Sequence, residues 1–346
     1  MKTKKSTASL PKVTVLYNET DILPHSDSSA LLTVDGAQED ALIIQSALQE
    51  AGYVSDIFNL SKTSAKDLPS VKSDLFFNLC DGIGNLPHTE EKVPEMLDRY
   101  KLFYTGADKN AIIVTTNKIL AKKIFQAHGI PTPNFLFFNT GDVKDSGNLR
   151  FPLIVKPSSQ DCSIGLQSTS VVYNLTDLKK EVAKNWETYK EPVLVEEFID
   201  HRELNLTVLG NGDDLLVLPI SEIIFGKSFD SGQKPKIIDF DAKWIENTDS
   251  YKDTNGVCPA DIPQELEEKI KEYAKTTYRA VGARDYARMD IRLDKNLNPY
   301  FLEVNVNPDL YPGMGASRAA KTHGWTYSEF IGKITSAAAE RYRLIS

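Results

Sequence analysis

Cysteine is scarce in this sequence. Its three cysteines, Cys80, Cys162 and Cys258, lie far apart and form no Cys-x-x-Cys pair. An odd number of scattered cysteines is not the pattern of a disulfide framework. The cysteine content therefore favours a reduced protein of the cytoplasm.

Long apolar runs and an excess of positive charge are also missing. No stretch approaches the roughly 18 apolar residues of a membrane helix, so no membrane contact is predicted. The basic start, Met1 to Ser9, leads into Leu10-Pro11-Lys12 instead of an apolar segment, which predicts a loose tail and not a signal peptide. The net charge of −8 disfavours general binding of nucleic acid.

The length and composition are those of a protein with real hydrophobic cores. The chain has 346 residues, of which 41% are hydrophobic and 25% charged, and this length corresponds to two or three domains. In its first part, apolar runs alternate with helical patterns, which predicts a parallel sheet covered by helices. The predicted strands are Val13 to Tyr17, Tyr53 to Leu60, Leu75 to Leu79 and Leu102 to Tyr104, and the helices are Ala37 to Ala51 and Glu90 to Tyr100.

The remainder predicts helices mixed with antiparallel strands. Thr116 or Asn117 can cap a helix that ends at Gly129, and Gly210 to Asp213 is the turn of a predicted hairpin. The predicted strands are Leu153 to Pro157, Leu166 to Val172, Val193 to Ile199, Leu204 to Leu209 and Leu215 to Ile220, and further helices are Leu175 to Lys190, Pro263 to Val281 and Tyr327 to Arg341.

Two alternating segments near the C-terminal end carry the strongest chemical signal. Asp285 to Leu293 and Pro299 to Pro308 alternate apolar and polar residues, which is the pattern of strands with one buried face. The segment between them, Asp294 to Asn298, is rich in turn formers. The sequence therefore predicts an antiparallel hairpin with one polar face.

The polar face of this hairpin has the composition of a metal site. Pairing about the turn places Arg288 opposite Asn305, and Asp290 opposite Glu303. Opposed carboxylates on paired strands are about 5 Å apart and repel each other unless a cation lies between them. Carboxylate and amide oxygens suit Mg²⁺. We predict a magnesium site here; the alternative is a solvated face with charges placed by chance.

Two lysines add the cations of a phosphate site. Lys156 ends a predicted strand and precedes the small polar loop Ser158 to Gly165, and Lys118 lies at the start of a predicted helix, where backbone N–H groups favour anions. In phosphoryl transfer, Mg²⁺ and cations neutralise the phosphates and a loop excludes water. Each lysine taken alone is better explained as a solvated surface residue.

In this order and spacing, the motifs resemble those of the ATP-grasp superfamily and, within it, of the D-alanine–D-alanine ligase-like enzymes. The resemblance extends from Asn78 to Trp325, and the spacing from Asp290 to Glu303 and Asn305 matches the metal-binding pattern of that family. The segments that carry it are Phe103-Tyr104-Thr105-Gly106, Asn117-Lys118, Gly129-Ile130-Pro131-Thr132-Pro133, Val155-Lys156-Pro157, Ser163-Ile164-Gly165, Val193-Leu194-Val195-Glu196, Arg202-Glu203-Leu204, Ala242-Lys243, Ala287-Arg288-Met289-Asp290 and Glu303-Val304-Asn305.

The resemblance implies a role for each matching position. The implied roles are phosphate contacts by Lys118 and Lys156, an adenine pocket lined by Glu196, Phe198 and Ile199, ribose contacts by Glu203, a γ-phosphate contact by Lys243, a catalytic phosphate loop that contains Ser163, stabilisation of the transferred phosphoryl group by Arg288, and metal binding by Asp290, Glu303 and Asn305. For Phe198 and Ile199, packing in a hydrophobic core is an equally good explanation.

The implied fold is an α/β (α+β) three-domain ATP-grasp fold. Its expected parts are an N-terminal parallel α/β domain (1–114), a central subdomain with the phosphate loop (115–192) and a C-terminal domain with the metal-binding hairpin (193–346). The implied enzyme is an ATP-dependent carboxylate–amine ligase that forms an acyl phosphate and releases ADP and phosphate. Two Mg²⁺ ions are expected, or Mn²⁺ in their place, with small amino-acid or carboxylate substrates, and a homodimer is expected from the resemblance alone.

Two other functions remain as alternatives. One is a ligase of a biosynthetic cluster that joins an amino acid to a partner of another kind. The other is an ATP-binding regulatory protein without turnover, although such a protein need not keep Arg288.

The substrate end departs from the family pattern. The loop after the first strand, a His-Gly step, the residue after Lys243 (here Trp244) and the turn after the last metal ligand all differ. Asp161 and Asp309 add negative charge, which favours a cationic or amine-rich partner, and Cys162 has no assigned role. We therefore predict that D-alanine paired with D-alanine is not the best substrate.

Overall fold

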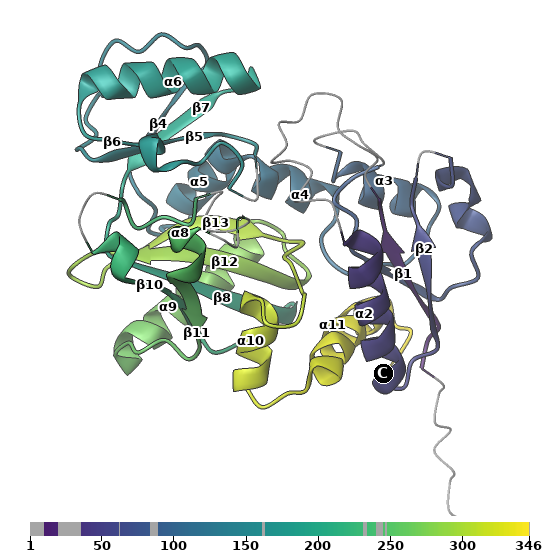
Figure 1. Cartoon of the computed structure of the whole chain (residues 1–346). Helices are drawn as coiled ribbons and strands as arrows, with labels where there is room; N and C mark the ends of the chain where they lie inside the picture. Colours follow the sequence, from purple (N-terminus) through teal and green to yellow (C-terminus); the bar gives the residue numbers. More distant parts are fainter. Residues whose placement is uncertain are drawn as a thin grey trace, which may run out of the picture.

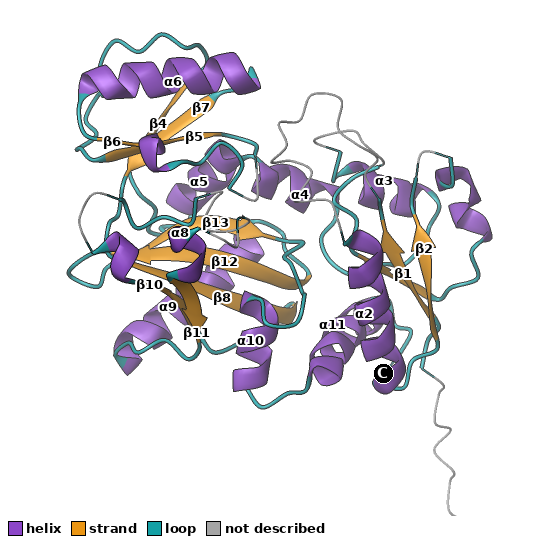
Figure 2. Ribbon diagram, in the orientation of Figure 1, coloured by secondary structure: helices purple, strands orange, loops and turns teal. Residues whose placement is uncertain are grey.

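The computed structural model describes residues 10–19, 36–61, 63–83, 89–160, 163–230, 234–239, 245 and 248–345. The strands of these residues form three sheets. Figures 1 and 2 show the three sheets at separate places in the molecule, with helices packed against each of them.

The N-terminal sheet is parallel, as predicted. Its strand order is β2 (Ser55–Asn59), β1 (Val13–Tyr17), β3 (Leu75–Asn78), and every residue of β1 is buried, as expected for a central parallel strand covered on both faces. Helix α2 (Ala37–Glu50) and helix α3 (Lys92–Arg99) also lie where the periodicity predicted them.

The predicted strand from Leu102 to Tyr104 is wrong. Tyr104 forms only an isolated parallel bridge with Phe76. The chain then turns away at Gly106, whose φ of 84° suits glycine, and enters helix α4 (Lys109–Thr116), which was not predicted. Asp108 caps α4 by accepting hydrogen bonds from the backbone N–H groups of Asn110 and Ala111.

The central sheet is antiparallel, in the order β4 (Phe135–Phe138), β7 (Val193–Glu197), β5 (Leu153–Pro157), β6 (Val171–Val172). Helix α6 (Leu175–Tyr189) packs on it through Leu178 and Val182. The predicted return strand from Leu166 is reduced to the two residues of β6, because Ser168–Ser170 forms a 3-10 helix, η2.

The largest sheet carries the predicted hairpin. Its order is β11 (Thr254–Val257), β10 (Ser221–Phe225), β8 (Arg202–Asn211), β12 (Asp285–Leu293), β13 (Pro299–Asn305), with β9 (Asp214–Val217) also paired to β8. The remaining elements are α5 (Lys118–Ala127), α8 (Asp249–Lys252), α9 (Gln264–Ala280), α10 (Gly315–Thr322), α11 (Tyr327–Arg341), and the 3-10 helices η1 (Ala65–Ser70) and η3 (Lys227–Phe229).

The two faces of the largest sheet differ in composition. Alternate residues of β8 and β12, such as Leu204, Leu206, Met289 and Ile291, join a core formed with α4, α5 and α9. The alternation of side chains along a strand then places the polar residues between them on the opposite face. The hydrophobic pattern therefore decides which face is free for chemistry.

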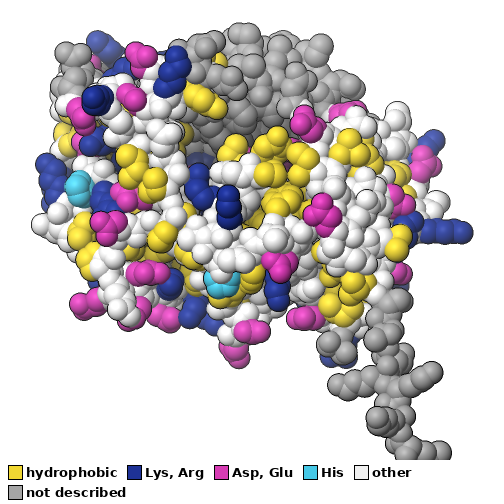
Figure 3. All heavy atoms as spheres, turned by 60° about the horizontal axis from the view of Figure 1, so that its bottom comes forward, with side chains coloured by type: hydrophobic (Ala, Val, Ile, Leu, Met, Phe, Trp, Pro, Cys, Tyr) yellow, Lys and Arg dark blue, Asp and Glu magenta, His cyan; other side chains and the backbone are white. Residues whose placement is uncertain are grey.

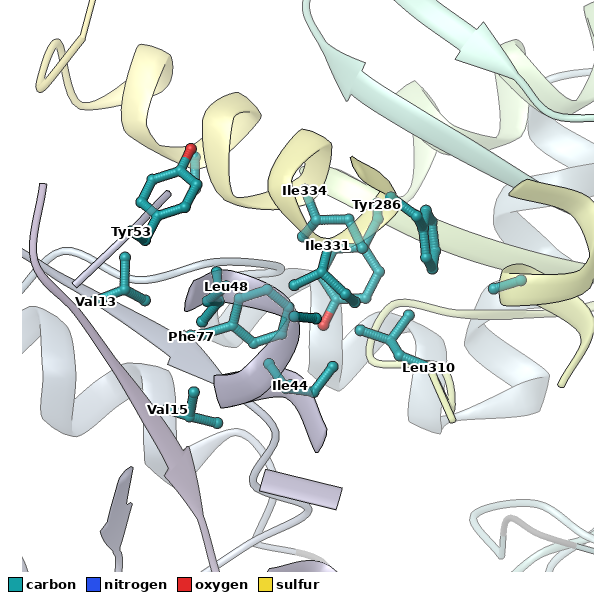
Figure 4. Close-up of a cluster of buried hydrophobic side chains, with 14 of the residues drawn as sticks. Val13, Val15, Ile44, Leu48, Tyr53, Phe77, Tyr286, Leu310, Ile331 and Ile334 are labelled. Atoms are coloured by element: carbon teal, nitrogen blue, oxygen red, sulfur yellow. The ribbon is translucent and has the colours of Figure 1, made fainter. Parts of the chain in front are cut away.

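One core joins the two ends of the chain. Figure 4 shows Ile331 and Ile334 of α11 beside Leu48 of α2 and Phe77 of β3. Next to this core, the fully buried Asp285 accepts hydrogen bonds from the Gly106 N–H at 2.8 Å and from the Arg341 guanidinium at 2.7 Å. The N-terminal sheet and the last helix are thus packed as one unit.

The domain limits stay a prediction. The three sheets follow the order of the proposed parts, but β7, which begins at 193, pairs with strands of the central sheet, and α11 packs against the N-terminal part.

Of the helices that the structure describes, none is long and apolar enough to cross a membrane. Figure 3 shows basic, acidic and hydrophobic side chains mixed over the face that it draws.

Candidate active site

The hairpin has the predicted register at its polar end. Arg288 pairs with Asn305, and Asp290 pairs with Glu303, in antiparallel strands. A bulge follows Asp290, so that Ile291 pairs with Phe301, and the register of the last pairs is shifted by one residue from the prediction. The bulge lies beyond the four polar residues and leaves their common face unchanged.

The polar face extends beyond the hairpin onto β8 and β10. Asn205 of β8 lies opposite both Asp290 and Ser221, and Thr207 lies opposite Arg288. Cross-strand neighbours share a face of the sheet. The sheet therefore presents polar side chains in neighbouring rows: Thr207, Arg288 and Asn305 in one, and Ser221, Asn205, Asp290 and Glu303 in the next.

Arg288 and Asp290 form a two-point ion pair. The Nε and terminal nitrogen of Arg288 each donate to one carboxylate oxygen of Asp290 at 3.0 Å. Asp290 is the main reason that the pKa of the Arg288 guanidinium is raised above its ordinary value, against the opposing effect of burial. Arg288 is therefore a permanent cation whose direction is set by the neighbouring carboxylate.

Lys118 connects the hairpin to the polar loop. Of the two residues expected to cap this helix, it is Asn117 that caps α5, by accepting a hydrogen bond from the Leu120 N–H at 2.9 Å. The Lys118 backbone N–H donates to the Ser158 carbonyl, its side-chain amine donates to the Gln160 carbonyl, and Nζ lies 3.8 Å from a Glu303 carboxylate oxygen. The structure thus brings Lys118, the start of the loop and the hairpin of β12 and β13 together.

Glu196 lies between two lysines. It is 1% exposed and forms ion pairs with Lys156 of β5 and Lys122 of α5. Burial alone would raise the pKa of the Glu196 carboxyl, but the two lysines outweigh it and lower that pKa below its ordinary value. Burial lowers the pKa of Lys122, which also donates to the Thr132 hydroxyl at 2.8 Å. Glu196 is therefore an ionised, buried carboxylate that holds Lys156.

Arg292 gathers the predicted nucleotide residues. One of its terminal nitrogens donates to the Ile199 carbonyl at 3.1 Å, another donates to Glu203 at 2.6 Å, and the guanidinium lies 5.2 Å from the centre of the Phe198 ring. Burial raises the pKa of Glu203, and Arg292 opposes that shift. Phe198 and Ile199 are half-buried, and Phe198 also packs against the small core of Ile154.

The predicted phosphate loop is described in part. Ser163 has a left-handed φ of 62° and donates to the Ile238 carbonyl at 2.8 Å, which ties the loop to the segment 234–239. Asp161, Cys162, Lys243 and Trp244 lie outside the described residues.

The donor set at the hairpin fits a magnesium ion. Asp290, Glu303 and Asn305 offer oxygen atoms from two paired strands, and two carboxylates facing each other favour a bound cation. Within the described part of the chain no cluster of three or more His, Cys, Asp or Glu residues could hold a metal. Two carboxylates and an amide would therefore need further oxygen atoms from phosphate and water, as Mg²⁺ commonly has.

The fold and this site define an ATP-grasp protein. D-alanine–D-alanine ligase from Bacillus anthracis complexed with ATP has the same fold, with a TM-score of 0.73, 20% identity and coverage of 96% of this chain and 99% of that one. The family model described as D-ala D-ala ligase C-terminus matches residues 124–336.

Sequence relatives agree with the fold. The chain is 33% identical to the uncharacterized protein y4sG of Sinorhizobium fredii, over 86% of this chain and 87% of that protein. It is 30% identical to the D-alanine–D-alanine ligase of Carboxydothermus hydrogenoformans, over 85% of this chain and 90% of that enzyme. The chain belongs to the D-alanine–D-alanine ligase family, and the predicted fold is confirmed.

This membership confirms the predicted enzyme class: the chain is an ATP-binding, ADP-forming ligase that makes C–N bonds. A ligase for a partner that is not an amino acid, and a regulatory protein without turnover, are not favoured.

Three residues of the site were missed at the level of sequence. Lys122 follows Lys118 by one helical turn, so the two lysines lie on the same face of α5. Arg292 follows Asp290 by two strand positions, so both side chains lie on the same face of β12. Asn205 occupies the same face of β8. Period-based arguments could have found Lys122 and Arg292; the burial of Lys122 against Glu196 required the tertiary structure.

Asp40 supplies a test by pH. Partial burial raises its pKa to about 6, with Asp309 and Glu39 adding to the shift. Because the folded pKa is above the unfolded value of 3.8, the folded chain binds the extra proton, and stability is lost as pH rises from about 4 to about 6. Asp40→Asn should therefore stabilise the protein at pH 7.5 by about 1 kcal/mol after allowance for solvent screening, and not at pH 4.

Urea unfolding at the two pH values measures this difference. Gln38→Ala, at an exposed and uncharged position of the same helix, is the control and should change stability equally at the two pH values. An equal effect of Asp40→Asn at pH 4 and pH 7.5 would show that Asp40 does not titrate between them.

Proposed function

We propose that this protein is an ATP- and Mg²⁺-dependent ligase that joins two small amino acids through an acyl phosphate and releases ADP and phosphate. The observation that supports it most is the meeting of Arg288, Asp290, Glu303 and Asn305 on one sheet face, beside Lys118. D-alanine is the substrate in the names of several relatives and is the first amino acid to test.

The nucleotide would bind between the central sheet and the largest sheet. Phe198, Ile199 and Glu196 would contact the adenine, and Glu203, held by Arg292, would accept hydrogen bonds from the ribose. Lys156 and Lys118 would bind the α- and β-phosphates. A lysine binds phosphate as a compact charge on a flexible side chain. In this structure the Lys156 amine pairs with Glu196 and the Lys118 amine donates to the Gln160 carbonyl, so both amines would have to move to reach the phosphates.

The hairpin would carry the phosphoryl transfer. Two Mg²⁺ ions held by Asp290, Glu303 and Asn305 would neutralise charge on the phosphate oxygens. Arg288, oriented by Asp290, would donate to the transferred phosphoryl group, and Lys243 would reach the γ-phosphate. The carboxylate of the first amino acid attacks the γ-phosphorus, so that ADP leaves; the amine of the second then attacks the acyl carbon, loses a proton and expels phosphate.

Exclusion of water is required because an acyl phosphate hydrolyses readily when water reaches it. The loop that contains Ser163 would close over the phosphates, and its contact with the Ile238 carbonyl is one point at which it is held. The protein supplies no nucleophile of its own; its contribution is positioning and electrostatic stabilisation.

The nucleotide product tests this proposal. Chromatography should show ADP, and not AMP, accumulating together with the ligated product when ATP, Mg²⁺ and a productive pair of amino acids are present. AMP and pyrophosphate would contradict attack on the γ-phosphate.

The same assay addresses the substrate. Phosphate release is measured with D- and L-amino acids, singly and in pairs. Because the segments at the substrate end depart from the family pattern, we predict that kcat/KM for another pair exceeds kcat/KM for D-alanine with D-alanine. A higher kcat/KM for paired D-alanine than for every other pair would refute that prediction and leave the ligase proposal intact. A cytoplasmic location and a homodimer stay proposals, the first from the reduced cysteines and the second from the family.

A further inference from the structure

A cavity of about 610 Å³ lies between α10 and the start of α11. Among the described residues, its lining contains two cationic side chains and no carboxylate. The residues that matter here are Gly313 and Ser317 at the N-terminal end of α10, Arg318 and Lys321 further along it, and Trp325 and Tyr327 beyond its C-terminal end.

Arg318 has too few acceptors for its donors. One terminal nitrogen donates to the Gly313 carbonyl at 3.3 Å, whereas Nε is buried and has no hydrogen-bond partner among the described residues. A Cβ on Gly256 would collide with the guanidinium, so the guanidinium occupies space that the lack of a side chain at Gly256 leaves open. In the described part of the chain no carboxylate pairs with it, and its burial lowers the pKa of the guanidinium. A half-buried guanidinium with unused N–H donors is suited to bind an anion from outside the chain.

Tyr327 and Lys321 supply two further hydrogen-bond donors to the lining of the cavity. The Tyr327 hydroxyl is buried without a hydrogen-bond partner among the described residues, and burial raises its pKa, with Asp40 and Asp309 adding to the shift, so that it keeps its proton as a donor. Lys321 is exposed and forms no ion pair with any described residue. One cavity therefore brings together an exposed ammonium and two buried donors, the Arg318 Nε and the Tyr327 hydroxyl, that have no acceptor among the described residues.

We propose that this cavity binds a compact organic carboxylate. The fork of the Arg318 guanidinium matches a carboxylate, Lys321 and Tyr327 can donate to its second oxygen or to a further acidic group, and Trp325 offers apolar surface to the carbon skeleton. The carboxylate has two sources: an acidic amino acid that the enzyme uses as substrate, or a free dicarboxylate that acts on the enzyme from outside the reaction.

The position of α10 connects the cavity to the reaction. Between Gly313 and Ser317 lies Gly315, where a Cβ would approach the Asn205 side-chain oxygen to 2.7 Å. Asn205 pairs with Asp290 across the sheet. The first turn of α10 thus lies between the cavity, which Gly313 and Ser317 line, and the polar face of the sheet, which Gly315 contacts at Asn205. The substrate source rests on the proposed function; binding of a free carboxylate does not.

Asp309 contributes negative charge near Tyr327, whose pKa it helps to raise. Its Oδ1 accepts a hydrogen bond from the Tyr311 N–H at 2.8 Å, within its own turn, and Asp309 is absent from the lining of the cavity. The sequence-based expectation of a cationic partner rested on Asp309 together with Asp161, which lies outside the described residues.

Calorimetric titration of the full chain with sodium succinate tests the site, with sodium chloride of equal ionic strength as the blank. Arg318→Gln and Lys321→Ala should each weaken succinate binding at least about tenfold, whereas Arg318→Lys, which keeps the charge and loses the fork, should weaken it less. Lys269→Ala, at an exposed position of α9, is the matched control and should bind like the parent. Thermal unfolding of each variant without succinate establishes that it is folded.

Kinetics then distinguish the two sources. If the carboxylate belongs to a substrate, Arg318→Gln should raise KM for aspartate or glutamate at least about tenfold while KM for alanine and kcat hold. If it belongs to a free ligand, succinate should change the rate with alanine in the parent and not in Arg318→Gln. The proposal is overturned if neither succinate binding nor the use of acidic amino acids differs between the parent and both folded variants. A parent that releases no phosphate with any pair refutes the ligase proposal alone, because succinate binding is measured independently.

Discussion

Replacing Glu303 by glutamine is expected to lower kcat at least about a hundredfold while the protein stays folded. The change is nearly isosteric, and it removes one of the two carboxylates that face each other on β12 and β13. The donor set would lose the charge that holds Mg²⁺ against the phosphates. Loss of the repulsion between Asp290 and Glu303 and loss of the Lys118–Glu303 ion pair act in opposite directions, so the free energy of unfolding without metal should change by no more than a few tenths of a kcal/mol.

Steady-state phosphate release over a range of Mg²⁺ concentrations, together with urea unfolding in EDTA, measures both effects. Glu268→Gln on the exposed side of α9 is a matched control and should leave both unchanged. Turnover equal to that of the parent, with the same requirement for Mg²⁺, would mean that the hairpin is not the metal site.

Lys122→Met is expected to have the largest effect on stability. Lys122 is fully buried, pairs with Glu196 and donates to Thr132. Its loss leaves a buried carboxylate with one partner where it had two, which should lower the free energy of unfolding by about 3 kcal/mol. Glu196 would then hold the Lys156 amine more strongly, so KM for ATP should rise by about tenfold if Lys156 binds the nucleotide phosphates.

The neighbouring residue provides the control. Lys123 is exposed and lies 4.8 Å from the Phe137 ring, so Lys123→Met should change stability by less than about 0.5 kcal/mol. A double-mutant cycle with Glu196→Gln measures how much of the lost stability comes from the Lys122–Glu196 pair. A Lys122→Met variant that matches Lys123→Met in unfolding and in KM for ATP would show that the buried lysine does not govern Lys156.

Local patterns were sufficient wherever neighbours in sequence decide the structure. The alternation of Asp285 to Leu293 and the turn that follows it set the pairing of Arg288 with Asn305 and of Asp290 with Glu303, because a register slip of one residue would expose the apolar face. The cap at Asn117 is local for the same reason, since its side chain reaches only the first turn of its own helix.

Contacts between distant segments decided the rest. The sequence by itself determined the parallel N-terminal sheet, the hairpin and the residue types of the site, because hydrophobic periodicity and turn chemistry are read over a few residues. Only the tertiary structure placed β7 in the central sheet, α11 against α2, and Lys122 beside Glu196. These depend on which buried faces and charges meet after the chain folds, and a lysine on a helix has the same local pattern whether it faces solvent or a buried carboxylate.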